Sequence, residues 1–324
     1  MTETTYRDAL KEAIRDAMRE DPSIILMGEE VGAYGGAYAV SKGLLDEFGV
    51  ERIIDTPISE AGFVGAGVGA AMAGLRPIVE LMYADFFGVA FDQIGNQAAK
   101  IRYMFGGQIG VPMVLRAQGG TGRSAGAQHS QSLEAMIMHT PGLRLAMPGT
   151  ITDAYLLLRH ALTLPDPVVI IEHKSLYARP GTLDKTAPVQ WGKAIVRREG
   201  HDLTIVTYSR MIHFCLEAAE KLAELGISVE VIDLRTLNPL DRDTITTSVR
   251  KTGRALVVSE AVYTAGVAAE LSALIAEECF ASLEEPVIRL AGEDIPIPVS
   301  PMLEAASIPS VERIMSTARM LVRR

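Results

Sequence analysis

The sequence has few cysteines, no block of basic residues and no long apolar segment, and each shortage excludes a class of protein. Its only cysteines, Cys215 and Cys279, are too few for a disulfide framework or a cysteine-based zinc site, so we expect a reducing compartment. Lys and Arg number 31 against 40 Asp and Glu, giving a net charge of −9. This acidic balance argues against nucleic acid or an anionic membrane as the main partner.

The longest stretch without a charged residue, 61–75, has 15 residues that are largely Gly and Ala. It is shorter than the roughly 20 apolar residues that a membrane span needs. The chain begins with polar residues followed by an amphipathic segment, without the apolar core of a signal peptide. We therefore expect a cytoplasmic protein with no membrane partner.

In the first half of the chain, short apolar runs alternate with segments of helical periodicity. A first helix should start at a capping box formed by Thr5 and Asp8 and end near Pro22. Apolar runs predict strands at 24–27, 77–82, 111–115 and 168–171, and periodicity predicts helices at 61–73, 89–103 and 151–162. Strands that are apolar on both faces and separated by helices indicate a parallel sheet covered on both sides.

A segment rich in Pro, Gly and polar residues, 178–191, interrupts this alternation and predicts a domain boundary. Beyond it, strands are expected at 203–207, 229–234, 255–259 and 287–290. One helix should end near 224, a second should lie near 241–250, and a third should span 267–280. The predicted fold is α/β, with two tandem domains that have mainly parallel sheets. Their expected bounds are 1–180 and 193–324, joined by a linker at 181–192.

The motif GAGVGA at 65–70, with Glu80 downstream, matches the G-x-G-x-x-A form of a dinucleotide-binding fingerprint. That fingerprint needs a strand running directly into its first glycine, whereas these glycines lie inside a longer helical stretch. We favour a helix face of small residues, at 62, 66, 69, 70 and 73, that lets another helix approach closely. Such a face suits a subunit interface.

The motif GRSAG at 122–126 fits the nucleophile elbow of a serine hydrolase, with Ser124 as the nucleophile. The glycine-rich residues 119–122 separate Ser124 from the preceding strand, and no oxyanion-hole loop lies upstream, so this alternative is the weaker one. In the same loop, His129 follows a buried strand and is placed for proton transfer. A hydrogen-bonded structural histidine fits this pattern equally well, and no partner at metal-ligand spacing accompanies it.

Carboxylates follow two of the predicted strands. Glu60 ends a predicted strand at 52–58 and begins the glycine-rich helix, in a neighbourhood without other charges. Desolvation there favours a proton held against a basic ligand nitrogen, whereas the alternative is a first-turn residue with Ser59 as N-cap. Glu29 and Glu30 end the first strand, at the sheet edge where ligands usually bind.

Several motifs resemble the beta subunit of the thiamine-diphosphate-dependent 2-oxo acid dehydrogenases, and the resemblance runs from about residue 5 to the C-terminus. The most specific is DTPISEAGFVGAGVGAAMAGLRP at 55–77. The others are GEEVG at 28–32, AQHSQ at 127–131, EHKSLY at 172–177 and DLRTL at 233–237. The resemblance implies a pyrimidine-binding, transketolase-like domain followed by a domain like the transketolase C-terminal domain.

The resemblance also implies roles by position. Glu60 matches the glutamate that hydrogen-bonds the aminopyrimidine ring of thiamine diphosphate and favours its imino tautomer. His129 matches the histidine that protonates or orients the substrate-derived intermediate, and Phe86 matches the aromatic residue that stacks on the pyrimidine. Other positions near the cofactor match Glu29, Ile58, Ser59 and Met82.

Family members that hold the diphosphate use a Gly-Asp-Gly motif and an Asn pair, which supply oxygen ligands to magnesium. This chain has no Gly-Asp-Gly, and its only asparagines, Asn96 and Asn238, are far apart. The resemblance therefore implies an α₂β₂ heterotetramer whose alpha subunit holds the phosphates and magnesium, docked on a lipoyl acyltransferase core. Some relatives bind potassium at positions that match the carbonyls of Met113, Ala161 and Leu162 and the side chain of Asp166.

We therefore expect the beta subunit of a thiamine-dependent oxidoreductase, active together with an alpha subunit. It would decarboxylate pyruvate or cleave acetoin and pass the acyl group to lipoamide on the partner acyltransferase. AQHSQ and EHKSLY look more like the pyruvate and acetoin enzymes than the branched-chain ones. The alternatives are a branched-chain 2-oxo acid dehydrogenase beta subunit, the C-terminal subunit of a split transketolase and a noncatalytic assembly module.

Overall fold

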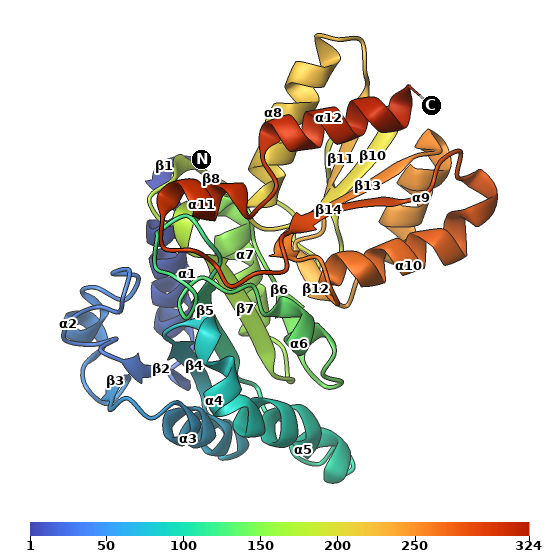
Figure 1. Cartoon of the computed structure of the whole chain (residues 1–324). Coiled ribbons are helices and arrows are strands. Elements are labelled where there is room, and N and C mark those ends of the chain that lie inside the picture. Colours follow the sequence, from blue (N-terminus) through green and yellow to red (C-terminus); the bar gives the residue numbers. More distant parts are fainter. Residues whose placement is uncertain (324) are drawn as a thin grey trace. The chain divides into compact units, whose positions relative to one another are not determined.

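The computed structural model describes residues 1–323, which group into two compact α/β units (Figure 1). The first unit comprises residues 1–119 and 136–191, and the second comprises residues 120–135 together with the chain from 192 onward. Each unit is built on a mainly parallel sheet, which confirms the predicted fold class. The boundaries at 1–180, 181–192 and 193–324 stay a prediction.

The parallel sheet of the first unit has the strand order β6-β7-β5-β4-β2-β3. Its strands are β2 (Ile24–Glu29), β3 (Ile53–Thr56), β4 (Arg76–Leu81), β5 (Val114–Gly119), β6 (Arg144–Ala146) and β7 (Val168–His173). β3 ends directly before Pro57, and β5 begins at Val114, two residues after Pro112. Both strands therefore differ from the predicted bounds of 52–58 and 111–115.

An antiparallel pair outside this sheet joins β1 (Thr2–Thr5) to β8 (Pro180–Leu183). β8 lies in the segment that the sequence marks as a break. The pattern missed both strands because each has four residues and neither is an apolar run.

The helices of the first unit cover both faces of its sheet. They are α1 (Tyr6–Glu20), α2 (Leu44–Phe48), α3 (Glu60–Met72), η1 (Ala84–Phe86), α4 (Phe87–Phe91), the π-helical η2 (Asp92–Ala98), α5 (Ala99–Met104), α7 (Ile151–Ala161) and η3 (Lys174–Leu176). The N-cap of α1 is Thr5, which accepts a hydrogen bond from the N–H of Asp8, as the capping box predicts. The predicted helix at 89–103 is divided by a π-helical segment.

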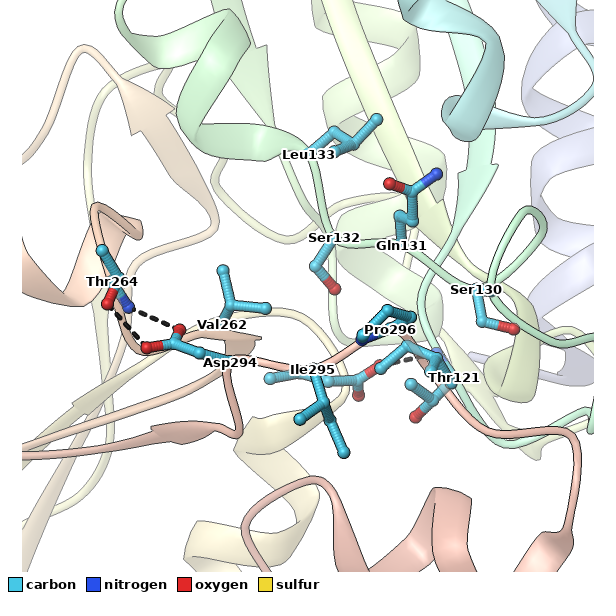
Figure 2. A pocket seen from close by; sticks show the side chains of 13 residues that line it. Thr121, Ser130, Gln131, Ser132, Leu133, Val262, Thr264, Asp294, Ile295 and Pro296 are labelled. Atoms are coloured by element: carbon cyan, nitrogen blue, oxygen red, sulfur yellow. Dashed lines mark hydrogen bonds between the residues drawn. The ribbon is translucent and has the colours of Figure 1, made fainter.

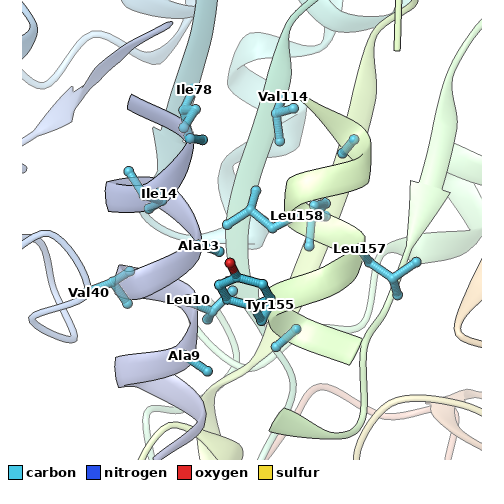
Figure 3. Close-up of a cluster of buried hydrophobic side chains, with 14 of the residues drawn as sticks. Ala9, Leu10, Ala13, Ile14, Val40, Ile78, Val114, Tyr155, Leu157 and Leu158 are labelled. Atoms are coloured by element: carbon cyan, nitrogen blue, oxygen red, sulfur yellow. The ribbon is translucent and has the colours of Figure 1, made fainter. Parts of the chain in front are cut away.

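One face of the sheet holds the main core of the unit. α1 and α7 pack together there, with Leu10, Ile14 and Leu158 against Ile78 of β4 (Figure 3). Val79 points to the opposite face, because successive side chains of a strand alternate. α3 covers that second face.

Gly67 lets α3 approach β4 closely. A Cβ atom on Gly67 would lie 2.6 Å from Val79 Cγ2. The GAGVGA motif is therefore a segment of α3, as expected, whereas the approach of another helix to the predicted small-residue face stays a prediction. Of the predicted small-residue face, Gly62, Ala66, Gly69 and Ala73 are exposed, and Ala70 is half-buried.

The sheet of the second unit has the order β14-β13-β10-β11-β9, with only the edge strand β9 antiparallel. Its strands are β9 (Ile195–Arg198), β10 (Leu203–Thr207), β11 (Val229–Asp233), β13 (Ala255–Val262) and β14 (Ile288–Gly292). A short strand, β12 (Thr236–Asn238), follows β11 in the chain but is not part of this sheet. The helices are α8 (Met211–Ala223), α9 (Arg242–Thr252), α10 (Val267–Cys279), η4 (Phe280–Ser282), α11 (Pro301–Ala306) and α12 (Val311–Val322). The sequence pattern predicted the four parallel strands but missed β9, α11 and α12.

No helix among residues 1–323 is long and apolar enough to cross a bilayer. The longest charge-free segment, 61–75, consists mainly of α3.

Candidate active site

Six of the predicted site residues follow three adjacent strands of the first unit. Glu29 is the last residue of β2, and Ile58, Ser59 and Glu60 follow β3. Met82 and Phe86 follow β4. In the order β4-β2-β3 these strands are neighbours and parallel, so their carboxyl ends meet at one edge of the sheet. The fold therefore brings these six positions to the same edge.

Two of these residues form a buried carboxyl pair. Glu29 is 4% exposed and Glu60 is 9% exposed. Burial raises the pKa of Glu29, and the nearby charge of Glu60 raises it further. Glu29 Oε1 has no hydrogen-bond partner within residues 1–323. The pair therefore offers acceptor atoms to a ligand that carries N–H donors.

Ile58 and Ser59 directly precede Glu60 at the start of α3. The apolar side chain of Ile58 is 81% exposed although it lies beside the buried pair. Ser59 occupies the N-cap position of α3, but its side chain makes no cap bond, and its hydroxyl donates to Pro57 O at 3.3 Å. Ser59 is thus the N-cap residue and Glu60 lies in the first turn of α3, as the structural alternative predicts, although the cap lacks a side-chain hydrogen bond.

A buried ionic network links the central strands of the same sheet. Arg116 of β5 donates to Glu172 of β7 through Nε at 2.6 Å and Nη2 at 2.7 Å. Its Nη1 donates to Glu80 of β4 at 2.8 Å. Gln118 also donates to Glu80, at 3.0 Å, and the Tyr177 hydroxyl donates to Glu172, at 2.6 Å.

In this network Glu80 of β4 pairs with Arg116 of β5. Glu80 is therefore not the acidic residue that a dinucleotide-binding fingerprint would use to bind a ribose. Burial raises the pKa of Glu80, while the Arg116 charge opposes that rise. The pKa of Tyr177 is raised well above its usual value by burial and by the charge of Glu172. Sequence reasoning missed this network, although each of its charged residues interrupts an apolar strand and so needs a buried partner.

His129 lies in a loop of the second unit, residues 120–131, which we call the His129 loop. The N–H of Gly120 donates to Gln131 O at 3.2 Å and closes the loop at its base. The N–H of His129 donates to Gly126 O at 3.3 Å. His129 itself is half-buried. The short helix α6 (Glu134–Met138) follows.

Ser124 lies in the middle of this loop, with φ of +53°. It does not stand on a sharp turn from a strand into a helix, as a nucleophile elbow requires. Its N–H donates to Glu304 Oε2 at 3.0 Å. The geometry therefore gives the serine-hydrolase alternative no support.

A cavity of about 580 Å³ lies in the second unit beside the His129 loop. Figure 2 shows the segment from Ser130 to Leu133 on one wall and Asp294, Ile295 and Pro296 on the other. Just beyond Leu133, Glu134 is buried and accepts a hydrogen bond from the Tyr208 hydroxyl at 2.8 Å. Burial raises the pKa of Glu134 to about 7.

The residues that match a potassium site already have partners in the chain. Met113 O accepts from Val168 N at 2.9 Å, and Leu162 O accepts from Arg76 Nη1 at 2.8 Å. Asp166 forms ion pairs with Arg102 at 3.0 Å and Arg144 at 3.2 Å. No group of three or more His, Cys, Asp or Glu residues within 1–323 could hold a metal ion. Since carbonyl ligands fall outside such groups, the potassium site stays a prediction.

Comparison with known families assigns a class to both parts of the chain. Residues 2–180 match the family described as "Transketolase, pyrimidine binding domain", and residues 192–314 match "Transketolase, C-terminal domain". The fold and the candidate site thus define a transketolase-like protein with a pyrimidine-binding domain. Within that class, the chain belongs to the family of the beta subunits of pyruvate and acetoin dehydrogenases.

The relatives that show this family align over nearly the whole chain. "Pyruvate dehydrogenase E1 component subunit beta-1, mitochondrial" of Arabidopsis thaliana is 49% identical over 98% of this chain and 89% of its own length. "Acetoin:2,6-dichlorophenolindophenol oxidoreductase subunit beta" of Cupriavidus necator is 46% identical over 96% and 95%. The predicted resemblance is thereby confirmed.

A solved structure, "Split gene transketolase, inactive beta4 tetramer", has the same fold. It superposes with a TM-score of 0.82 and covers 98% of both chains at 21% identity. At this identity the likeness shows the fold alone, so it does not favour the split-transketolase alternative.

Proposed function

We propose that this chain is the subunit that binds the pyrimidine half of thiamine diphosphate in a dehydrogenase acting on pyruvate or acetoin. The observation that carries the proposal is the buried pair of Glu29 and Glu60 at the carboxyl ends of β2 and β3. The motif around Glu60 and the family membership of the chain point to the same cofactor.

The residues of this edge fit an aminopyrimidine ring. Its amino group and protonated ring nitrogen are donors, and the carboxyl pair presents acceptors, including Glu29 Oε1. Phe86 is half-buried and offers an aromatic face for stacking, worth roughly 0.5–1.5 kcal/mol beyond area burial. Ile58, Ser59 and Met82 would complete the surroundings of the ring.

In this proposal Glu60 holds a proton against the ring nitrogen and thereby sets the tautomer of the pyrimidine. A positioned proton donor or acceptor contributes typically ~10²–10⁴-fold to a rate. When bound, the cofactor supplies carbanion stabilisation, which allows the bond beside a carbonyl to break. His129 protonates or orients the reacting substrate.

The partners follow from what the chain supplies. An alpha subunit would hold the diphosphate and magnesium in an α₂β₂ heterotetramer, with the exposed small-residue face of α3 as a candidate contact. The acyl product would pass to lipoamide on an acyltransferase core. A potassium ion at Met113, Ala161, Leu162 and Asp166, and a cytoplasmic location, complete the proposal.

The test is Glu60→Gln in the tetramer co-expressed with its alpha subunit, with the exposed Glu51→Gln as matched control. Turnover of pyruvate, acetoin and branched-chain 2-oxo acids is followed with an artificial electron acceptor, and assembly by size-exclusion chromatography. We expect Glu60→Gln to lower kcat at least ~100-fold with assembly intact, while Glu51→Gln changes neither. Unchanged turnover in Glu60→Gln would support the noncatalytic assembly module instead.

A further inference from the structure

Two buried carboxylates of the second unit hold the start of the His129 loop. Glu304 of α11 accepts from the N–H of Gly122 through Oε1 at 2.8 Å and from the N–H of Ser124 through Oε2 at 3.0 Å. Glu260 of β13 accepts from the N–H of Thr121 through Oε1 at 2.6 Å. Within residues 121–124, three backbone N–H groups therefore donate to carboxylate oxygens.

Both glutamates reach the loop from distant parts of the chain, across 182 residues for Glu304 and 139 residues for Glu260. Glu304 is 3% exposed and Glu260 is 8% exposed. A carboxylate this buried costs free energy unless charges or hydrogen bonds compensate it. The loop amides supply that compensation, so the two glutamates and the loop depend on each other.

The backbone of the loop explains why it needs such support. Gly122, Ser124 and Gly126 all have positive φ, at +88°, +53° and +79°. Alternating conformations of this kind turn successive N–H groups toward one side and form a concave anion-binding nest. Here the chain fills the nest with its own Glu304. Ser124 has a Cβ atom, so its left-handed conformation is unfavourable by itself and must be imposed by its surroundings.

Further contacts fix the same stretch. Arg210 Nη1 donates to the Thr121 hydroxyl at 3.2 Å and lies 3.6 Å from Glu260 Oε2. At Gly126, with φ of +79°, a Cβ atom would come within 2.8 Å of Val299 Cγ2, so a side chain there would be strained and would displace Val299. Val299 lies close before α11, which carries Glu304.

We propose that Glu304 and Glu260 are positioning residues, which set the geometry of the His129 loop and thereby place His129 for proton transfer. The inference rests on the proposed function only for the role of His129. The restraint itself comes from the contacts of Thr121, Gly122 and Ser124.

Hydrogen exchange of the loop amides in the α₂β₂ tetramer tests the restraint without any assay of activity. The variants are Glu304→Ala, which removes both acceptors, and Glu304→Gln, which keeps one carbonyl oxygen and adds a donor. Glu217→Gln on α8, at an exposed ion pair with Lys221, is the matched control. In Glu304→Ala we expect hydrogen exchange at the amides of both Gly122 and Ser124 to rise at least about tenfold. In Glu304→Gln we expect this rise at one of the two amides, and in the control variant at neither. Equal exchange in all four proteins overturns the inference.

Turnover of the same tetramers tests the positioning role. We expect kcat per folded tetramer to fall about 10- to 100-fold in Glu304→Gln, with KM and the Kd for thiamine diphosphate within about twofold, since the cofactor residues lie on the first unit. Faster loop exchange with an unchanged kcat overturns positioning. If wild-type turns over none of the substrates, the proposed function fails, whereas faster exchange in the variants still supports the restraint of the loop.

Discussion

Arg116→Leu tests whether the buried ionic network holds the central strands together. Arg116 is fully buried and makes three charge-assisted bonds, two to Glu172 and one to Glu80. Leucine restores apolar volume but leaves two carboxylates in the interior without their cation. Breaking a buried ion pair from one side costs about 3–5 kcal/mol.

The expected loss of stability can be measured by urea unfolding and by thermal unfolding, both followed by circular dichroism. For a unit of this size each kcal/mol lowers Tm by about 2–4 °C, so Arg116→Leu should lower it by ~6–20 °C. The matched control is Arg19→Leu, which breaks the pair with Glu47 at 2.6 Å on the surface. That pair is more than half exposed on the arginine side and should contribute less than about 1 kcal/mol.

The pH dependence supplies a second check on the same variant. Burial raises the pKa of Glu80 and the Arg116 charge opposes that rise, so without Arg116 the native state of the variant binds a proton at Glu80 that the unfolded state releases. Stability then falls as pH rises, and the deficit of Arg116→Leu should be smaller at pH 5 than at pH 8. A deficit below about 1 kcal/mol, or one that grows on acidification, would refute this reasoning.

Three further predictions follow from single contacts. Burial raises the pKa of Glu134 from 4.5 to about 7, so between these pH values the native state keeps a proton that the unfolded state releases. The free energy of unfolding should therefore fall by ~3 kcal/mol as pH rises from 4.5 to 7. Glu134→Gln should remove this pH dependence in urea titrations. An unchanged pH dependence of the free energy of unfolding in Glu134→Gln would contradict this assignment. Gly67→Val should cost ~1–3 kcal/mol by thermal unfolding, since its Cβ meets Val79 Cγ2 at 2.6 Å, whereas Gly69→Ala, with nothing within 4 Å, should not destabilise; equal effects would disprove the close approach. Cys215 is buried and its thiol pKa is raised to about 12, so alkylation of the native protein at pH 8 should be no faster than unfolding, and a rapid labelling phase at Cys215 would contradict its burial.

The sequence predicted those parts of the fold that local periodicity encodes. β10 occupies the predicted residues 203–207, and α7 differs from its prediction by one residue. Short edge strands such as β1, β8 and β9 carry no apolar run, so the pattern could not reveal them. β3 is shorter than its predicted run and β5 is shifted toward the C-terminus, because apolar residues beside Pro57 and Pro112 extend the pattern without joining the sheet.

The candidate site likewise contains residues that the sequence pattern can single out and residues that it cannot. Glu29 was singled out because it ends a predicted strand at the carboxyl edge of a parallel sheet, and Glu60 because its neighbourhood lacks other charges and its motif resembles the family. Glu304 was missed because its partners in the His129 loop lie 182 and 180 residues away, and no local pattern encodes such a contact. The Arg116 network had a visible signal, since charges inside apolar strands require buried partners.

The central claim is that Glu60, supported by Glu29, holds the pyrimidine ring of thiamine diphosphate. It is tested most directly by a crystal structure of the α₂β₂ tetramer with the cofactor bound. The account predicts a ring nitrogen within hydrogen-bond distance of the Glu60 carboxylate, about 2.6–3.2 Å, with Phe86 against the ring face. A cofactor whose ring lies away from both Glu60 and Glu29 would contradict it.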